Sequence, residues 1–128
     1  MTFTAFRDRI GFTSDFIYRL NNEADSFRFS DSANIDLALG YRLFPGIYKS
    51  FHDKVLNVYL EFNTLLSQRA CLNGEEVLDS GGTVAFLSPG VQAVLTPRFL
   101  VEAALQIPVL QNLSGSQLAF SATASFGI

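Results

Sequence analysis

Residues 34–43 read Asn-Ile-Asp-Leu-Ala-Leu-Gly-Tyr-Arg-Leu, and this stretch decides the fold class. Every second residue is apolar, and the residues between them are polar or small. A period of two places the two sets on opposite faces of an extended chain. The stretch therefore predicts a β-strand with one apolar face, formed by Ile35, Leu37, Leu39, Tyr41 and Leu43.

The same alternation recurs on both sides of this stretch. It is regular in 56–64, 99–107 and 118–128, and less regular in 10–20 and 83–95. A bulge or bend is expected at Ser88-Pro89-Gly90, because proline cannot donate to a strand ladder. Residues 2–6 add part of a further strand, and no segment favours a helix of useful length. The sequence predicts an all-β, antiparallel up-and-down meander of about six to seven strands.

The connections between these segments differ in length. Those beginning at Asn21, Leu65 and Pro108 are long or of medium length, whereas 96–98 is very short. Outer-membrane barrels have short periplasmic turns and longer outer loops. The C-terminus and the short turn are therefore expected at one end of the sheet, and the three longer links at the other. Only 45–55 is long for a periplasmic turn.

Composition leaves two classes of β protein open. Hydrophobic residues make up 48% of the 128 residues and charged residues only 16%, against about 25% charged in soluble domains. No apolar run approaches the roughly 18 residues of a membrane helix. Such a chain forms either a large buried β core or a membrane barrel. The net charge of −3 with no visible basic patch gives little support for nucleic-acid binding, so no nucleic-acid partner is expected, and the lone Cys71 excludes an internal disulfide.

The chemistry of the second strand face favours the membrane barrel. A soluble sheet should expose mixed charges there, but this face carries mostly small or uncharged polar residues and no lysine. Aromatic residues near strand ends resemble interfacial girdles, namely Tyr18, Tyr41, Phe44, Phe62, Phe99 and Phe126. The residues expected to line a lumen are Asp15, Arg19, Asn34, Asp36, Arg42, Asn57, Tyr59, Glu61, Asn63, Gln92, Glu102 and Gln106.

A strand register follows for the best-defined hairpin. If Phe44 lies near Val55, Gly40 falls opposite Tyr59, and we expect the tyrosine ring to fold over this glycine. The same register places Ala38 opposite Glu61 and Arg42 opposite Asn57. Across the tight turn, Gln92 falls opposite Glu102.

No constellation of residues indicates catalysis. The only histidine stands in Ser50-Phe-His-Asp53, and residues this close in a loop cannot form a catalytic triad. No Cys/His pattern has metal-ligand spacing, and no glycine-rich loop could hold a phosphate. We therefore predict no enzyme activity, no catalytic residue, no metal and no cofactor.

Three segments in this order resemble a known family. They are 34–45, then 86–92 with 95–98, and last 102–111 with 115–118. Together they are similar to the outer-membrane family known as "MetA pathway of phenol degradation". The resemblance implies a larger barrel that moves small hydrophobic or aromatic solutes across the bacterial outer membrane. It also implies a C-terminal signal for the outer-membrane assembly machinery, formed by Phe120, Phe126 and Ile128, with Ile128 replacing the usual terminal aromatic residue.

Two expectations concern the extent of the chain and the alternative to a barrel. Six or seven strands are fewer than the roughly eight of the smallest single-chain barrels, and the N-terminus lacks the apolar region of a signal peptide. Residues 1–128 are therefore expected to be one domain, the C-terminal portion of a barrel in the lipid bilayer, without its N-terminal strands. The alternative is a soluble β-sandwich or a lipocalin-like ligand-binding module, in which the apolar face would be buried.

Overall fold

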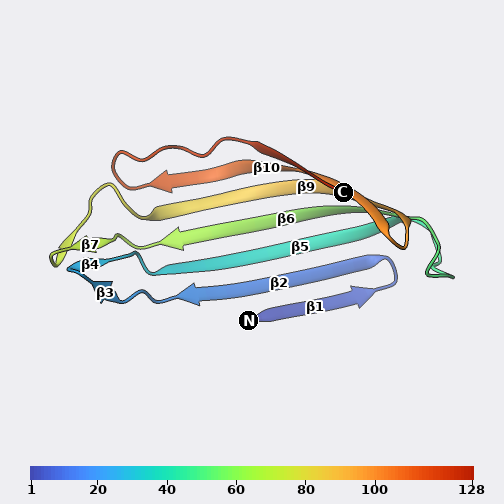
Figure 1. The fold of residues 1–128 in the computed structure, drawn as a ribbon, viewed down its shortest axis with the longest axis horizontal. Helices are drawn as coiled ribbons and strands as arrows, with labels where there is room; N and C mark the ends of the chain where they lie inside the picture. Colours follow the sequence, from blue (N-terminus) through green and yellow to red (C-terminus); the bar gives the residue numbers. More distant parts are fainter.

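The computed structural model describes residues 1–128 and is built from antiparallel strands. It contains no helix that could span a bilayer. Seven strands form the main sheet in the order of the chain (Figure 1): β1 (Thr2–Arg7), β2 (Ile10–Arg19), β5 (Ser32–Phe44), β6 (Val55–Ser67), β9 (Gly82–Thr96), β10 (Phe99–Leu113) and β11 (Thr123–Gly127). The predicted all-β meander is confirmed.

The two longest links are not irregular loops. They form short hairpins that pair into a second, four-stranded sheet of β3 (Glu23–Ala24), β4 (Phe27–Arg28), β7 (Cys71–Leu72) and β8 (Glu75–Glu76). Both hairpins turn on two residues with positive φ, Asp25-Ser26 and Asn73-Gly74. Two-residue turns of this kind match the twist of paired strands. The Asn-Gly dipeptide was a hairpin signal that the sequence analysis did not use.

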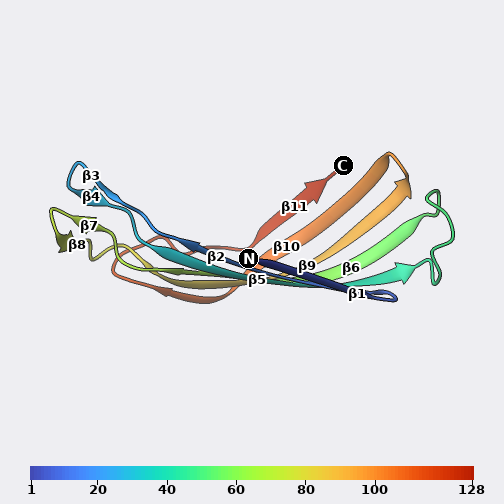
Figure 2. The same ribbon diagram turned by 90° about the horizontal axis from the view of Figure 1, so that it is seen from below.

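The connections between strands lie at two opposite ends of the main sheet. The small sheet lies beyond one end of the main sheet, which we call the hairpin end (Figures 1 and 2). The opposite turn end holds the β1–β2 turn, the β5–β6 loop and the β9–β10 turn, and the C-terminus lies toward it. The three longer links begin at the hairpin end, as predicted.

The expected bulge at residues 88–90 and the bounds of two strands differ from the prediction. No register shift occurs at residues 88–90; the shifts in the β9–β10 pairing lie at Phe99/Leu100 and between Pro108 and Leu110. Pro89 pairs with Leu60 of β6, and no β10 residue is paired with it. The proline is tolerated because its missing N–H falls where the ladder to β10 is already interrupted. β10 also runs on to Leu113, whereas β11 begins only at Thr123.

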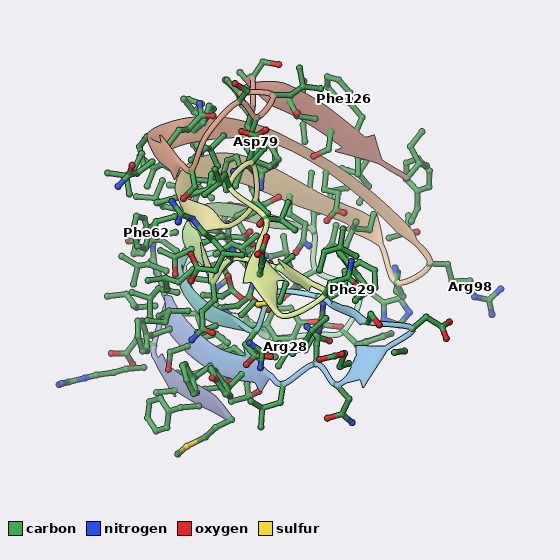
Figure 3. The ribbon with its side chains drawn as sticks, turned by 90° about the vertical axis from the view of Figure 1, so that its left-hand side faces the viewer. Arg28, Phe29, Phe62, Asp79, Arg98 and Phe126 are labelled. Carbon is green, nitrogen blue, oxygen red and sulfur yellow. The ribbon has the colours of Figure 1, made fainter.

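The main sheet is curved like a trough (Figure 2). Seen along the strands, it forms an arc, and Phe62 projects from the convex side (Figure 3). Phe62 pairs with Leu37, so the apolar set of β5 lies on the convex face and the polar set on the concave face. Leu39 is 53% exposed, whereas its neighbours Ala38 and Gly40 are half-buried.

The molecule has almost no interior. Only four residues are buried, namely Ala70, Val84, Ala85 and Ser88. A soluble domain of this length normally hides its leucine and phenylalanine side chains, but here many of them stand exposed, among them Phe12, Leu37 and Leu39 on the convex face. The sheet is not closed, because β1 and β11 are its two edges. These two strands run in the same direction, since every neighbouring pair between them is antiparallel.

Candidate functional site

The concave face collects the polar side chains of five neighbouring strands into rows that cross the sheet. In one row Asp15 pairs with Asp36, and Asp36 with Asn63. In another, Arg42 pairs with Asn57, Asn57 with Gln92, and Gln92 with Glu102. Between these rows stand Tyr59, Glu61 and Gln106, and toward the hairpin end stand Arg19 and Asn34. All the residues expected to line a lumen thus share the concave face.

Hydrogen bonds connect members of these rows from strand to strand. The amide of Asn57 donates to Gln92 Oε1 at 3.2 Å, and the Gln92 amide donates to Glu102 Oε2 at 3.4 Å. At the other row, Asn63 Nδ2 donates to Asp36 Oδ1 at 3.0 Å. Side chains that bond to one another across strands form an ordered polar surface instead of a set of free solvated groups.

Asp15 and Asp36 place two carboxylates directly opposite each other. Like charges in this position destabilise a strand pair. Each carboxylate has its own donor: Thr2 Oγ1 donates to Asp15 at 2.7 Å, and Asn63 donates to Asp36. The flanking strands therefore hold the two acids in place.

Aromatic rings cover glycines at the centre of the concave face. Gly40 lies opposite Tyr59 in the sheet, as the predicted register requires. The ring does not fold over Gly40, however. It folds over Gly90 on the other neighbouring strand, where an added Cβ would overlap ring atoms Cζ, Cε2 and Oη. The predicted position of the ring was wrong, because Tyr59 has a glycine on each side and the ring can occupy only one of them.

A second ring follows the same pattern at the sheet edge. Phe6 pairs with Gly11, and an added Cβ there would lie 2.9 Å from Phe6 Cε1. An aromatic ring over a cross-strand glycine recovers packing that the missing side chain loses. Phe86 adds a third ring to the concave face through its pairing with Asn63.

Ser88 is a concave-face residue that the sequence analysis missed. Only 5% of it is exposed, it pairs with Glu61, and its hydroxyl has no hydrogen-bond partner. Its position on this face could not be predicted, because a bulge was expected here.

The residues of the expected C-terminal signal, Phe120, Phe126 and Ile128, do not lie together on one strand face. Phe126 pairs with Ala103 on the convex face, and Ile128 lies beyond the last strand at 93% exposure. Phe120 precedes β11, and its ring meets Phe86 edge-on at 5.5 Å, on the concave side. Gln111 fixes this segment, since its amide donates to the Phe120 carbonyl and its carbonyl accepts the Phe120 N–H. The regular alternation of 118–128 predicted a single strand with Phe120 and Phe126 on one face, and this prediction was wrong, because only 123–127 form a strand.

Open hollows lie at both ends of the sheet. One of about 530 Å3 at the hairpin end is mostly polar and includes Asp31, Arg69 and Glu76. One of about 740 Å3 at the turn end lies beside the β5–β6 loop and includes Arg9, Lys49 and Lys54.

The segment around His52 is a hydrogen-bonded turn. The Asp53 carboxylate accepts the N–H groups of Lys49 and Ser50, and the His52 N–H donates to Ser50 Oγ. These bonds lower the pKa of Asp53 below its ordinary value. No bond links the His52 ring to the serine hydroxyl, and no three His, Cys, Asp or Glu side chains lie close enough together to hold a metal ion.

The concave face is thus an ordered polar wall bearing a few aromatic rings, with an apolar convex face behind it. Comparisons of the chain with protein-family models, with curated proteins and with solved structures found no match.

Proposed function

We propose that the chain forms part of the wall of a bacterial outer-membrane β-barrel, with the convex face in lipid and the concave face along a solute passage. The observation that carries this proposal is the direction of curvature. A soluble sheet that closes into a barrel around its core or ligand has its apolar face on the concave side, whereas this sheet has its apolar face on the convex side. An apolar face on the outside of an arc is suited to a hydrocarbon solvent.

The positions of aromatic residues on the convex face give further support. Tyr18 stands near the hairpin end of β2, and Tyr41, Phe99 and Phe126 stand toward the turn end of their strands. All four are exposed. Phe62 was also expected near a strand end, but it lies in the middle of β6 opposite Leu37, so that expectation was wrong. Aromatic rings near strand ends are typical of barrels at the membrane interfaces.

We further propose that the passage takes small hydrophobic or aromatic solutes. The resemblance to the phenol-degradation family suggests this class, and the rings of Phe6, Tyr59 and Phe86 on the concave face support it. A ring among amide and carboxylate groups offers an aromatic solute a stacking surface with polar groups beside it. Assembly by the outer-membrane machinery is part of the same proposal.

Adjacent positions on one strand provide a matched test of the wall. A single cysteine is placed at Leu39 or at Ala38 in the Cys71→Ser background, and each is labelled with an environment-sensitive fluorophore in lipid vesicles. The two labels have the same depth but opposite faces. Brominated lipid should quench the Leu39 label, and aqueous iodide the Ala38 label. Equal quenching of both by iodide, with a monodisperse monomer free of detergent, would instead support the soluble ligand-binding module.

The solute class has a separate test. Saturation-transfer NMR on the reconstituted chain should show transfer to phenol but not to glucose, and Tyr59→Ala should reduce the transfer. Transfer that is equal for the two solutes would rule out an aromatic preference.

A further inference from the structure

Basic residues that are scattered in the sequence gather at one end of the fold. Six of the nine Lys and Arg residues lie in or beside the turn end. The carboxylates in this region are fewer: Asp8, Asp53, Glu102 in the same row as Arg42, and the C-terminus. The six are Arg7, Arg9, Arg42, Lys49, Lys54 and Arg98. The hairpin end has the opposite character, with Glu23, Asp25, Asp31, Glu75, Glu76 and Asp79. We call the six cations the basic rim; the sequence showed no patch because three separate turns supply it.

The cations of the basic rim have no carboxylate partners. The two ion pairs of the structure join the N-terminal amine to Asp15 and Arg69 to Glu76, so neither involves the rim. Arg9 donates to the Gly46 carbonyl at 3.0 Å, and Arg42 lies 5.9 Å above the Tyr48 ring. The side chains of Lys49, Lys54 and Arg98 make no hydrogen bond, and Arg98 projects away from the sheet (Figure 3). Their charge is therefore available to a partner.

Apolar side chains stand among these cations. In the β5–β6 loop, Ile47 and Phe51 are 72% and 70% exposed, and Tyr48 is 46% exposed. They share the loop with Lys49 and Lys54, and the loop extends beyond the ends of the strands (Figure 2). Exposed aromatic and aliphatic groups beside lysine are the composition of segments that lie in a membrane–water interface.

We propose that the basic rim binds the phosphate head groups of an anionic phospholipid leaflet, with the β5–β6 loop seated in the interface. This inference rests on the proposed membrane wall and adds its lipid partner and orientation. It gives a role to a loop that is long for a periplasmic turn.

The distribution of charge favours a lipid surface over a single bound anion. The cations extend across the β1–β2, β5–β6 and β9–β10 turns, along the whole end of the sheet. A site for one free phosphate needs donors that converge on one point, and exposed Ile47 and Phe51 would add nothing to it. A bilayer presents many phosphates in a plane above an apolar layer. The phosphates match the cations of the basic rim, and the apolar layer matches the exposed apolar side chains of the β5–β6 loop.

The strength of the effect follows from the number of charges. Each Lys or Arg near an anionic leaflet increases binding about fivefold. Removal of Lys49 and Lys54 should thus weaken binding roughly twentyfold to thirtyfold. The loss should disappear at high salt, where the screening length falls to a few ångströms.

The test compares two charge-matched variants of the full chain, K49Q/K54Q and R28Q/R69Q. Both lose two positive charges, one pair from the turn end and the other from the hairpin end. Binding is measured by flotation with phosphatidylcholine vesicles, with and without a quarter of phosphatidylglycerol. We expect K49Q/K54Q to lose binding to the anionic vesicles only, and R28Q/R69Q to bind nearly as the natural chain does. A third variant, I47S/F51S, should bind both kinds of vesicle more weakly.

Equal losses in the two charge variants would overturn the proposal, because net charge alone would then explain the binding. Displacement by millimolar inorganic phosphate would also overturn it, in favour of a free-anion site. The fluorophore at position 39 distinguishes failure of the basic-rim proposal from failure of the proposed barrel wall. If only the rim is wrong, that label is quenched equally in both kinds of vesicle. If the wall is wrong, the chain binds anionic vesicles but leaves them at high salt, with the label unquenched.

Discussion

The Tyr59 ring gives a sharp prediction because it has a glycine on each side and covers only one. A methyl group added at Gly90 would overlap three ring atoms, whereas one added at Gly40 would have only the Gly11 carbonyl oxygen nearby, at 3.9 Å. We therefore expect Gly90→Ala to be destabilising and Gly40→Ala to be neutral or stabilising.

The magnitudes follow from where the ring can go. With Gly90→Ala the ring must leave its position, and overpacking costs about 1 to 3 kcal/mol. The open space over Gly40 offers an escape, which limits the cost to a rotamer change of about 0.5 to 1.5 kcal/mol. Gly40→Ala alone should gain about 0.4 to 1 kcal/mol, since alanine restricts the unfolded chain. The double variant closes both positions, so its loss of stability should exceed the sum of the single changes by about 1 kcal/mol.

The assay is reversible urea unfolding in detergent micelles, followed by the circular dichroism of the strands because the chain has no tryptophan. Tyr59→Ala is the control background: without the ring, the coupling between the two glycines should vanish. Strictly additive effects of Gly40→Ala and Gly90→Ala would refute the argument, since they would show that a ring displaced from Gly90 does not move over Gly40.

Three further predictions test other parts of the molecule. Leu39→Arg on the convex face should cost about 2 to 4 kcal/mol in lipid, measured by refolding into vesicles, and should cost little if that face meets water. Asn63→Ala removes the donor to Asp36 and should cost about 1 kcal/mol, more at low salt, whereas Asn34→Ala should not. The pKa of Asp53 is lowered by the bonds from Lys49 and Ser50, so the turn is stabilised above pH 3.8 and loses this stabilisation as pH falls through the lower folded pKa; Asp53→Asn should speed amide exchange at both donors at neutral pH.

The register of the β5–β6 hairpin could be predicted from its sequence, and the geometry follows it. Gly40 lies opposite Tyr59, Ala38 opposite Glu61, and Arg42 opposite Asn57. The pairing of Gln92 with Glu102 was equally accessible, because only a tight turn separates β9 from β10. In both cases a strong alternation and a local connection specify the register.

Other features depend on contacts that alternation does not encode. The pairing of β6 with β9 follows a long link, so the sequence did not reveal that Gly90 also lies beside Tyr59. The small sheet requires two distant hairpins to meet, Phe27 pairing with Leu72. Phe120 had the right spacing for a strand, but its backbone bonds to the Gln111 side chain instead of to a neighbouring strand.

The parallel directions of β1 and β11 impose a counting rule on any complete ring of strands. A ring in which every neighbour is antiparallel must contain an even number of strands, as bacterial single-chain barrels do. Seven strands with equally directed edges can enter such a ring only with an odd number of added strands between them. A second copy in the same orientation would meet the first through parallel edges. In such a ring, the strands added to these seven must number one, three, five or another odd number, and a strand count of the assembled ring would show which.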